Sequence, residues 1–311
     1  MRAVVVDPDV AGRLRIGTVD EPIPLSNQAL VRVQTTSLNP GECRRAAREA
    51  AGWRPGWDLA GTVIRPAADG SGPGVGTRVV GNISNGSWSE IVAARADFLS
   101  PIPDELSFEL ASTLPIAGLT PFRALEHGGF LLGRNVLITG ASGTVGAFAI
   151  QFARLSGARV VGVVRRAERA AIAQEAGAHI VAVGEDASVA APYGPYNVVL
   201  DGQGGQSLAA SLGMLAKDGI CVFFGTSASR EVHLDPHDFY LKGGGQLYGL
   251  SLGHELTKRG PAEDLARLAR MVVDGTLKVR VDVTASWREV AELVRRQLAR
   301  ETIGKIVMRI D

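Results

Sequence analysis

One stretch of the chain, from Asn135 to Arg166, constrains the fold more than any other. It opens with a short β-branched run at 136–139, which is typical of a buried parallel strand. A turn with three evenly spaced glycines follows, then apolar residues at helical spacing over 147–156 and a second β-branched run at 159–164. The stretch therefore predicts one strand–helix–strand unit.

The three glycines of the turn, Gly140, Gly143 and Gly146, indicate what this unit binds. Glycines at this spacing allow a tight turn, bring backbone N–H groups against a pyrophosphate and let the helix pack closely on the strand. The glycine pattern alone is a weak signal, but between a strand and a helix it predicts a dinucleotide site. A tight turn that binds no nucleotide is the alternative.

Two arginines at the end of the second strand bear on which dinucleotide is bound. Folds that prefer NAD place a carboxylate about twenty residues after the glycines, where it holds the ribose 2′-hydroxyl. Here Val164 is followed by Arg165 and Arg166, and Arg169 lies one helical turn further on. Guanidinium groups suit bidentate contact with a phosphate, so the sequence favours NADP. Solvated surface charges are the alternative interpretation.

The whole chain limits the other possibilities. Its 311 residues fit two domains. A net charge of +1 suggests no nucleic-acid or membrane partner, and without a long hydrophobic segment the protein is expected to be cytoplasmic. Cys43 and Cys221 are the only cysteines, so we expect neither a disulfide framework nor a cysteine-rich zinc cluster.

The texture of the sequence changes along the chain. The first hundred residues show short alternating runs broken by Pro, Gly and Asn, which is typical of a small β-barrel or sandwich. After Arg166, strands alternate with helices, which predicts a doubly wound parallel sheet. Two amphipathic helices and a closing strand at 305–310 end the chain.

In the order and spacing of its motifs, the chain resembles the zinc-free, zeta-crystallin-like quinone oxidoreductase branch of the medium-chain dehydrogenase/reductase superfamily. The resemblance covers nearly the full length. The matching segments are Arg32–Glu42, Pro55–Val63, Gly76–Gly81, Gly86–Glu90, Leu114–Leu125, Val136–Gly146, Val198–Gly205 and Gly304–Ile310.

The resemblance implies an α/β protein of two domains. A GroES-like β-barrel catalytic domain would cover residues 1–118 and be completed by 254–311, and a Rossmann NADP-binding domain with a doubly wound parallel sheet would cover 119–253. Cofactor and substrate would meet in the cleft between them. Relatives often form homodimers through an edge strand such as 246–252.

The resemblance also implies a set of cofactor-binding residues at the nicotinamide ribose, the pyrophosphate, the 2′-phosphate and the carboxamide. In chain order they are Thr120, Gly140, Ser142, Gly143, Thr144, Val145, Gly146, Arg165, Arg166, Arg169, Gly225, Thr226, Leu250, Ser251 and Leu252.

No metal is expected in the catalytic domain. Zinc relatives use a cysteine and a His-Glu pair, and the matching positions here are Asn39 and Trp57-Asp58. These side chains cannot assemble a catalytic zinc site, which needs three soft or imidazole ligands. His233 and His237 are the one histidine pair with metal-ligand spacing, and we expect them in a loop.

Three residues are predicted to be catalytic by analogy with the family. Asn39 would lie beside the nicotinamide, although it could simply form the turn before Pro40. Glu42 would neighbour the cofactor, although a helix-cap carboxylate would look the same. Trp88 stands where many relatives carry tyrosine, and an indole cannot act as a general acid. The predicted substrate contacts are Trp53, Trp57, Trp88 and Tyr240.

Without a Lewis acid, the chemistry depends on an electrophile that is already conjugated. The leading hypothesis is an NADPH-dependent oxidoreductase that reduces quinones or the C=C bond of α,β-unsaturated carbonyl compounds, with a small apolar carbonyl or quinone as its substrate. Two alternatives stay open, a non-redox cyclase or isomerase and a non-catalytic nucleotide-binding protein on the same scaffold.

Overall fold

The computed structural model describes residues 1–241 and 243–311, and these form two compact units. Unit 1 comprises Met1–Leu119 and Leu256–Asp311, and unit 2 comprises Thr120–Glu255. The chain passes into unit 2 within helix α3 (Leu114–Glu126) and returns within α8 (Leu252–Lys258). No helix in the described ranges has the length and apolar character needed to cross a membrane.

Unit 2 is built on a six-stranded sheet in which every pairing is parallel. Its order is β10-β9-β8-β11-β12-β13. The strands are β8 (Asn135–Ile138), β9 (Arg159–Val164), β10 (Ile180–Val183), β11 (Tyr196–Asp201), β12 (Leu215–Phe223) and β13 (Gln246–Gly249). The connecting helices are α4 (Thr144–Leu155), η3 (Ala167–Arg169), α5 (Ala170–Glu175), η4 (Ala187–Tyr193), α6 (Gly205–Gly213) and α7 (Pro236–Tyr240).

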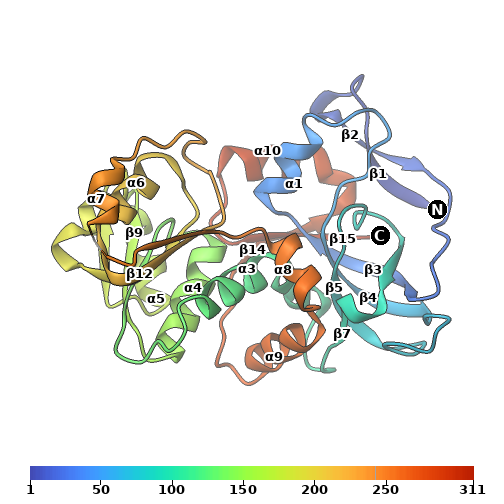
Figure 1. The fold of residues 1–311 in the computed structure, drawn as a ribbon. Helices are drawn as coiled ribbons and strands as arrows, with labels where there is room; N and C mark the ends of the chain where they lie inside the picture. Colours follow the sequence, from blue (N-terminus) through green and yellow to red (C-terminus); the bar gives the residue numbers. More distant parts are fainter. Residues whose placement is uncertain (242) are drawn as a thin grey trace. The chain divides into compact units, whose positions relative to one another are not determined.

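Helices cover both faces of this sheet. Figure 1 shows α4 and α5 on one side of it and α6 and α7 on the other. Such double coverage requires strands that are apolar on both faces, and Val160, Val161 and Val163 of β9 are fully buried. The strand order reverses between β8 and β11, which is the place where doubly wound folds bind their ligands. The predicted Rossmann-type sheet is confirmed.

Unit 1 contains a seven-stranded sheet and a separate hairpin. The sheet has the order β14-β15-β3-β4-β5-β7, with β6 paired to β3, and the hairpin is formed by β1 and β2. The strands are β1 (Arg2–Val6), β2 (Leu14–Thr18), β3 (Gln28–Ser37), β4 (Asp58–Arg65), β5 (Arg78–Asn82), β6 (Ile91–Arg95), β7 (Leu99–Pro101), β14 (Val281–Ser286) and β15 (Lys305–Arg309). The helices are η1 (Ala11–Arg13), α1 (Pro40–Ala46), η2 (Ala96–Phe98), α2 (Phe108–Ala111), α9 (Ala262–Val273), η5 (Trp287–Glu289) and α10 (Val290–Ala299).

The C-terminal segment of the chain completes the sheet of unit 1. Strand β15 pairs antiparallel with β3, where Val307 lies opposite Ser37. Strand β3 in turn pairs with β4. These pairings bring together residues near positions 37, 58 and 305, although they are far apart in the sequence.

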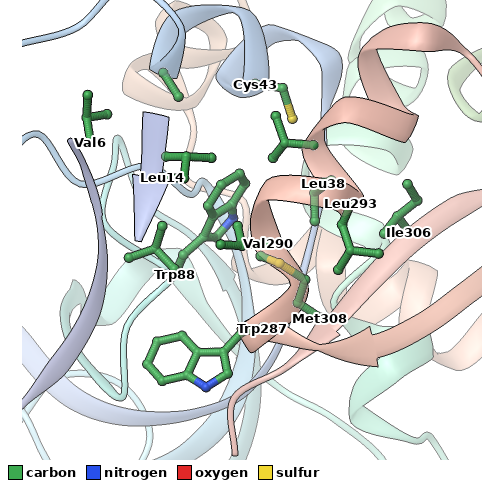
Figure 2. Close-up of a cluster of buried hydrophobic side chains, with 13 residues drawn as sticks. Val6, Leu14, Leu38, Cys43, Trp88, Trp287, Val290, Leu293, Ile306 and Met308 are labelled. Carbon is green, nitrogen blue, oxygen red and sulfur yellow. The ribbon is translucent and has the colours of Figure 1, made fainter. Parts of the chain in front are cut away.

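An apolar cluster in unit 1 joins the two ends of the chain. Figure 2 shows Trp88 among Val6, Leu14 and Leu38 from the N-terminal part and Trp287, Val290, Leu293, Ile306 and Met308 from the C-terminal part. Trp88 and Trp287 are the largest side chains that are fully buried. Their burial removes a large apolar area from water, so this cluster stabilises the contact between the N-terminal segment and the returning C-terminal one.

Candidate active site

The turn after β8 has the geometry that the glycine pattern predicts. Gly140 has a φ of +62°, a conformation that glycine adopts without steric cost. The Gly143 N–H donates to the Gly140 carbonyl oxygen at 2.9 Å, and α4 begins at the next residue. A Cβ atom on Gly146 would lie 2.4 Å from the Gly140 oxygen, so only glycine permits this close approach of the helix to the turn. The first N–H groups of α4 have no partner within the helix and suit an anion.

The predicted cofactor residues of unit 2 lie mostly after the carboxyl ends of its strands. Residues 140–146 follow β8, Arg165 and Arg166 follow β9, Gly225 and Thr226 follow β12, and Leu250–Leu252 follow β13. Because carboxyl ends of parallel strands meet at one edge of a sheet, the structure brings these residues to that edge. Thr120 lies in α3 and Arg169 in η3.

The two strand-end arginines differ in their surroundings. Both side chains are exposed, and Val164 before them is buried at the end of β9. Arg166 forms an ion pair with Glu168 at 3.7 Å. In solvent such a pair is weak and leaves the guanidinium able to exchange its partner for a phosphate. The role of these arginines in cofactor choice stays a prediction.

In unit 1, Asn39 and Glu42 begin helix α1. The Asn39 N–H donates to Glu42 Oε1 at 2.7 Å, and Asn39 Nδ2 donates to the same oxygen at 3.0 Å. Glu42 therefore closes the N-terminus of the helix, as its position three residues after the N-cap suggests. The cap role is compatible with a second role, because only one carboxyl oxygen takes part in it.

Asn39 and Glu42 belong to a buried group that we call the Asn39 cluster, formed by Ser37, Asn39, Glu42, Asp58 and Lys305. Asp58 Oδ2 accepts hydrogen bonds from Ser37 Oγ at 2.6 Å and from Asn39 Nδ2 at 2.7 Å, and Asp58 Oδ1 accepts one from the Ile116 N–H at 3.0 Å. Lys305 Nζ donates to Asn39 Oδ1 at 2.8 Å and to the Leu38 carbonyl oxygen at 2.9 Å. It lies 3.5 Å from Asp58 Oδ2.

The surroundings of Glu42 favour its protonated form. Burial is the main cause that raises the pKa of Glu42 to about 8, and the charge of Asp58 adds to it. The Lys305 ammonium and the hydrogen bonds from Asn39 act in the opposite direction. Glu42 Oε2 has no hydrogen-bond partner among the residues that the structure describes. At neutral pH the protonated form of this carboxyl group is therefore favoured, and no described residue accepts a hydrogen bond from Oε2.

The predicted Asn39 and its neighbour Cys43 are less suited to chemistry. The amide hydrogens of Asn39 are directed at Glu42 and Asp58, so in this arrangement Asn39 has no donor left for a substrate. Burial raises the pKa of Cys43 well above its ordinary value. The Cys43 thiol is therefore a core group and not a nucleophile.

Trp88 was predicted to be catalytic and to contact the substrate, and this role stays a prediction. Its side chain is fully buried in the apolar cluster of Figure 2, and its indole Nε1 has no partner in the described ranges. Its backbone is fixed as well, since the Val4 N–H donates to the Trp88 carbonyl oxygen at 2.8 Å. A motif position indicates which residue aligns with the tyrosine of relatives, but the large apolar indole fills the core instead.

The remaining predicted substrate residues are distributed over both units. Trp53 is half-buried against the apolar cluster, with the Arg45 guanidinium 4.9 Å from its ring centre. Trp57 is half-buried and lies so close to Gly41 that a Cβ atom there would be 2.7 Å from the Trp57 ring. Tyr240 is exposed at the end of α7 in unit 2. Contact of these three residues with a substrate stays a prediction.

Asp58 and Lys305 complete the Asn39 cluster, but they are absent from the predicted catalytic residues. The sequence shows Asp58 as the residue after a non-ligating tryptophan, and Lys305 as a match to a common family position that could pair with a nearby acid. The signal available was the presence of two carboxylates and one lysine at motif positions. Their contact depends on the pairing of β15 with β3, which the sequence does not reveal.

The residues at the positions of the zinc ligands in relatives do not fit a zinc ion. Trp57 offers no ligating atom, and Asn39 Oδ1 and Asp58 Oδ2 are both in contact with the Lys305 ammonium. Across residues 1–241 and 243–311, no group of three or more His, Cys, Asp or Glu side chains is placed to hold a metal ion. A cationic group among these oxygens repels a second cation.

Two family models match the chain. The model described as "Alcohol dehydrogenase GroES-like domain" matches residues 26–104, and the model described as "Zinc-binding dehydrogenase" matches residues 144–271. Together they match more than half of the chain. The first match confirms the predicted GroES-like fold for the strands of unit 1 that it covers.

Curated relatives include reductases of two kinds. The chain is 32% identical to a quinone oxidoreductase from Pongo abelii, over 51% of each chain. It therefore spans about half the length of that relative. It is also 26% identical to an acryloyl-coenzyme A reductase from Metallosphaera sedula, over 91% of this chain and 89% of the relative.

Solved structures agree with the fold over the whole length. A mycobacterial quinone oxidoreductase superposes with a TM-score of 0.88 at 27% identity and covers 100% of both chains. A mycobacterial protein in complex with NADPH superposes with a TM-score of 0.87 at 26% identity, again over 100% of both chains.

Proposed function

Because the chain belongs to the medium-chain dehydrogenase/reductase superfamily, we propose that it is an NADPH-dependent oxidoreductase acting on a small molecule. One observation carries the proposal: the glycine turn lies at the switch point of the parallel sheet, and arginines replace a carboxylate at the end of β9. The NADPH complex of a structural neighbour supports the same cofactor. The quinone oxidoreductase relatives agree with the predicted branch of the superfamily.

Unit 2 is the proposed cofactor-binding domain. The backbone N–H groups at the start of α4 bind the pyrophosphate, and Arg165 and Arg166 bind the 2′-phosphate. Thr120, Gly225, Thr226 and the segment 250–252 line the nicotinamide end. When bound, NADPH supplies a hydride. The residues of unit 2 bind and orient the cofactor and take no part in bond making.

Unit 1 is the proposed substrate domain, and the reaction it supports is reduction of a quinone or of the C=C bond of an α,β-unsaturated carbonyl compound without zinc. Such substrates are already polarised, so they need orientation and a proton and no Lewis acid. Glu42 holds a proton at neutral pH and is the proposed proton source. Asn39 orients Glu42 by binding Oε1 and leaving Oε2 without a partner.

Purified protein can be tested by following NADPH oxidation against a panel of quinones and enones. We expect turnover with one of these classes, and the class that reacts decides between quinone and C=C reduction. NADH should bind more weakly than NADPH. Titration that showed uptake of neither cofactor would overturn the proposal.

A second candidate, a nucleotide-binding protein without turnover, is favoured by one observation. Trp88 is in the core where many relatives carry tyrosine, and Asn39 has no spare donor, so neither of these two predicted catalytic residues offers a hydrogen bond to a substrate in this arrangement. The same assay separates the candidates, since NADPH binding without oxidation by any member of the panel supports the second.

The proposed assembly is a homodimer. Strand β13 lies at the edge of the sheet of unit 2, and Leu247 on it is exposed. Tyr240 and Leu241 at the end of α7 are exposed as well. An edge strand flanked by exposed apolar side chains is suited to pair with a second copy. Light scattering of the purified protein tests this, and a monomer at all concentrations would overturn it.

A further inference from the structure

Lys305 is a buried cation inside the candidate active site. Only 3% of the residue is exposed, and its ammonium contacts oxygen atoms of Leu38, Asn39 and Asp58. Leu38 and Asn39 follow β3, Asp58 begins β4 and Lys305 begins β15. A buried ammonium is costly unless it is paired and hydrogen-bonded. The Lys305 ammonium meets this condition, because it contacts three oxygen atoms.

We propose that Lys305 is a positioning residue, the internal cation that holds the Asn39 amide in one orientation and balances the carboxyl groups of Asp58 and Glu42. Through these two effects it sets the conditions under which Glu42 gives up its proton. The effect on turnover rests on the proposed function, but the orientation and the charge balance are properties of the folded chain and can be tested without cofactor or substrate.

The orientation follows from what each group can donate and accept. An ammonium only donates, so it selects the carbonyl oxygen of Asn39, which it contacts at 2.8 Å. Asn39 Nδ2 must then face Asp58 Oδ2 and Glu42 Oε1, which both lie within 3.0 Å of it. If the amide were turned over, its NH2 group would meet the ammonium and its oxygen would meet carboxyl oxygens. Lys305 therefore directs the Asn39 amide hydrogens toward Glu42 and Asp58.

The charge balance involves three ionisable groups from three elements. Glu42 on α1 is faced by Asp58 on β4, which disfavours its ionisation, and by Lys305 on β15, which favours it. The side chain of Cys43, next to Glu42, is also buried, and a thiol carries no positive charge. Within residues 1–241 and 243–311, Lys305 is thus the positive group that acts on the pKa of the Glu42 carboxyl group. Its removal should make Glu42 hold its proton more tightly.

The first test is an infrared titration of the folded protein without ligand. The spectrum of wild type minus that of Glu42→Gln isolates the carboxylic-acid band of Glu42. We expect this band at pH 7, with loss of the band as the pH passes about 8. In a Lys305→Met background the midpoint should move up by about one pH unit or more, since loss of a nearby opposite charge has this effect. Lys217→Met, at an exposed lysine on β12, should leave the midpoint unchanged.

A midpoint that is the same with and without Lys305 would overturn the proposal, as would absence of the acid band in the wild type at pH 7. Neither outcome depends on NADPH or on turnover, so failure of the proposed function leaves this test intact. If Lys305→Met does not fold, the double variant Lys305→Met with Asp58→Asn removes one negative charge along with the positive one. We expect the double variant to fold, and a double variant that also fails to fold would contradict the charge balance.

The second test uses activity once a substrate is known. Lys305→Met should lower kcat about tenfold or more at pH 7, leave the NADPH dissociation constant unchanged and shift the basic limb of the pH profile upward. Lys305→Arg keeps the charge and should restore the position of that limb, even if its larger head group lowers the rate. A merely structural lysine would change stability without moving the pH profile, and that result would overturn the positioning role.

Discussion

Asp201 in unit 2 and Glu42 in unit 1 are both completely buried carboxyl groups, but they differ in how many of their oxygens accept hydrogen bonds. In unit 2, Asp201 Oδ2 accepts a hydrogen bond from Thr139 Oγ1 at 2.9 Å, and Oδ1 accepts from the N–H groups of Gln203 at 3.1 Å and Gly204 at 2.7 Å. In unit 1, Glu42 accepts hydrogen bonds at Oε1 alone. Burial is the largest cause that raises the pKa of both groups.

The difference separates a structural carboxyl group from one suited to exchange a proton. The donors around Asp201 are neutral groups of its own unit, and they fix the loop that follows β11. The donors to Glu42 come from the neutral Asn39, but the charged Asp58 and Lys305 also act on it, and Glu42 Oε2 has no hydrogen-bond partner among the described residues. A buried polar atom without a partner costs stability, and such costs are concentrated at functional sites.

The largest effect is expected from Asp201→Ala. It would leave three buried donors without an acceptor, at about 1 to 3 kcal/mol each, so the free energy of unfolding should fall by about 3 kcal/mol or more. Denaturant unfolding measures this. Asp201→Asn is the matched control, because it retains one acceptor oxygen and should lose less. A loss below about 1 kcal/mol for the alanine variant would show that the donors find other partners.

Glu42→Gln should affect stability in a pH-dependent way. Its free energy of unfolding relative to wild type should increase as the pH rises. The pKa of Glu42 is raised in the folded protein from 4.5 to about 8, so the stability that its carboxyl group contributes is fully present below about 4.5 and is lost as the pH passes through about 8. Glutamine does not titrate. The stability of the variant relative to wild type should therefore increase between these values and then level off, by on the order of a few kcal/mol.

Urea unfolding of both proteins at several pH values measures this relative stability. Asp58 and Lys305 face Glu42 in both, so their own contribution cancels to a first approximation. If the difference between the two proteins is the same at pH 5 and pH 8, Glu42 is not held in its protonated form.

The two units also differ in how much of their structure the sequence could predict. The glycine turn, α4 and β9 are consecutive in the chain, so the pattern of residues 135–166 was sufficient to predict one strand–helix–strand unit, and the alternation after Arg166 predicted the parallel sheet of unit 2. The Asn39 cluster joins positions 39, 58 and 305 through the register of β15 on β3 and of β3 on β4. Register between distant strands depends on the tertiary fold and has no local signal.

Trp88 illustrates the other limit. Its place in a motif was evident from the sequence, but the direction of its side chain follows from the core that surrounds it. That core includes Trp287 and Met308, which come from the other end of the chain. The burial of Trp88 could not be predicted, because alignment with a motif carries no information about such neighbours.

The exposed arginines of unit 2 offer a contrast with the buried Lys305 of unit 1. Replacement of Arg165 and Arg166 by alanine should raise the KM for NADPH about 10- to 100-fold and leave that for NADH nearly unchanged, since only NADPH carries the 2′-phosphate. Because both side chains are exposed, the preference should weaken in high salt. The exposed Arg230 of the same unit is the control position, and Arg230→Ala should change neither KM. Equal effects on both cofactors would contradict the assignment.

The smallest effect extends the comparison from carboxyl groups to the two buried tryptophans of unit 1. Trp287 Nε1 donates to the backbone oxygen of Asp311 at 2.9 Å, whereas Trp88 Nε1 has no partner in residues 1–241 and 243–311. Both side chains are fully buried, so replacement by phenylalanine removes similar apolar volume in each case. Trp287→Phe additionally loses a hydrogen bond, and Trp88→Phe loses none.

We therefore expect Trp287→Phe to cost about 1 kcal/mol more than Trp88→Phe in denaturant unfolding, which is the contribution of one hydrogen bond. Trp88→Phe should also leave kcat and KM nearly unchanged at temperatures where the protein is folded, because the indole is a core group. A large loss of kcat in Trp88→Phe, with stability preserved, would support a role for Trp88 in catalysis. It would also mean that the unpartnered indole N–H, like Glu42 Oε2, is available to form a hydrogen bond with a ligand.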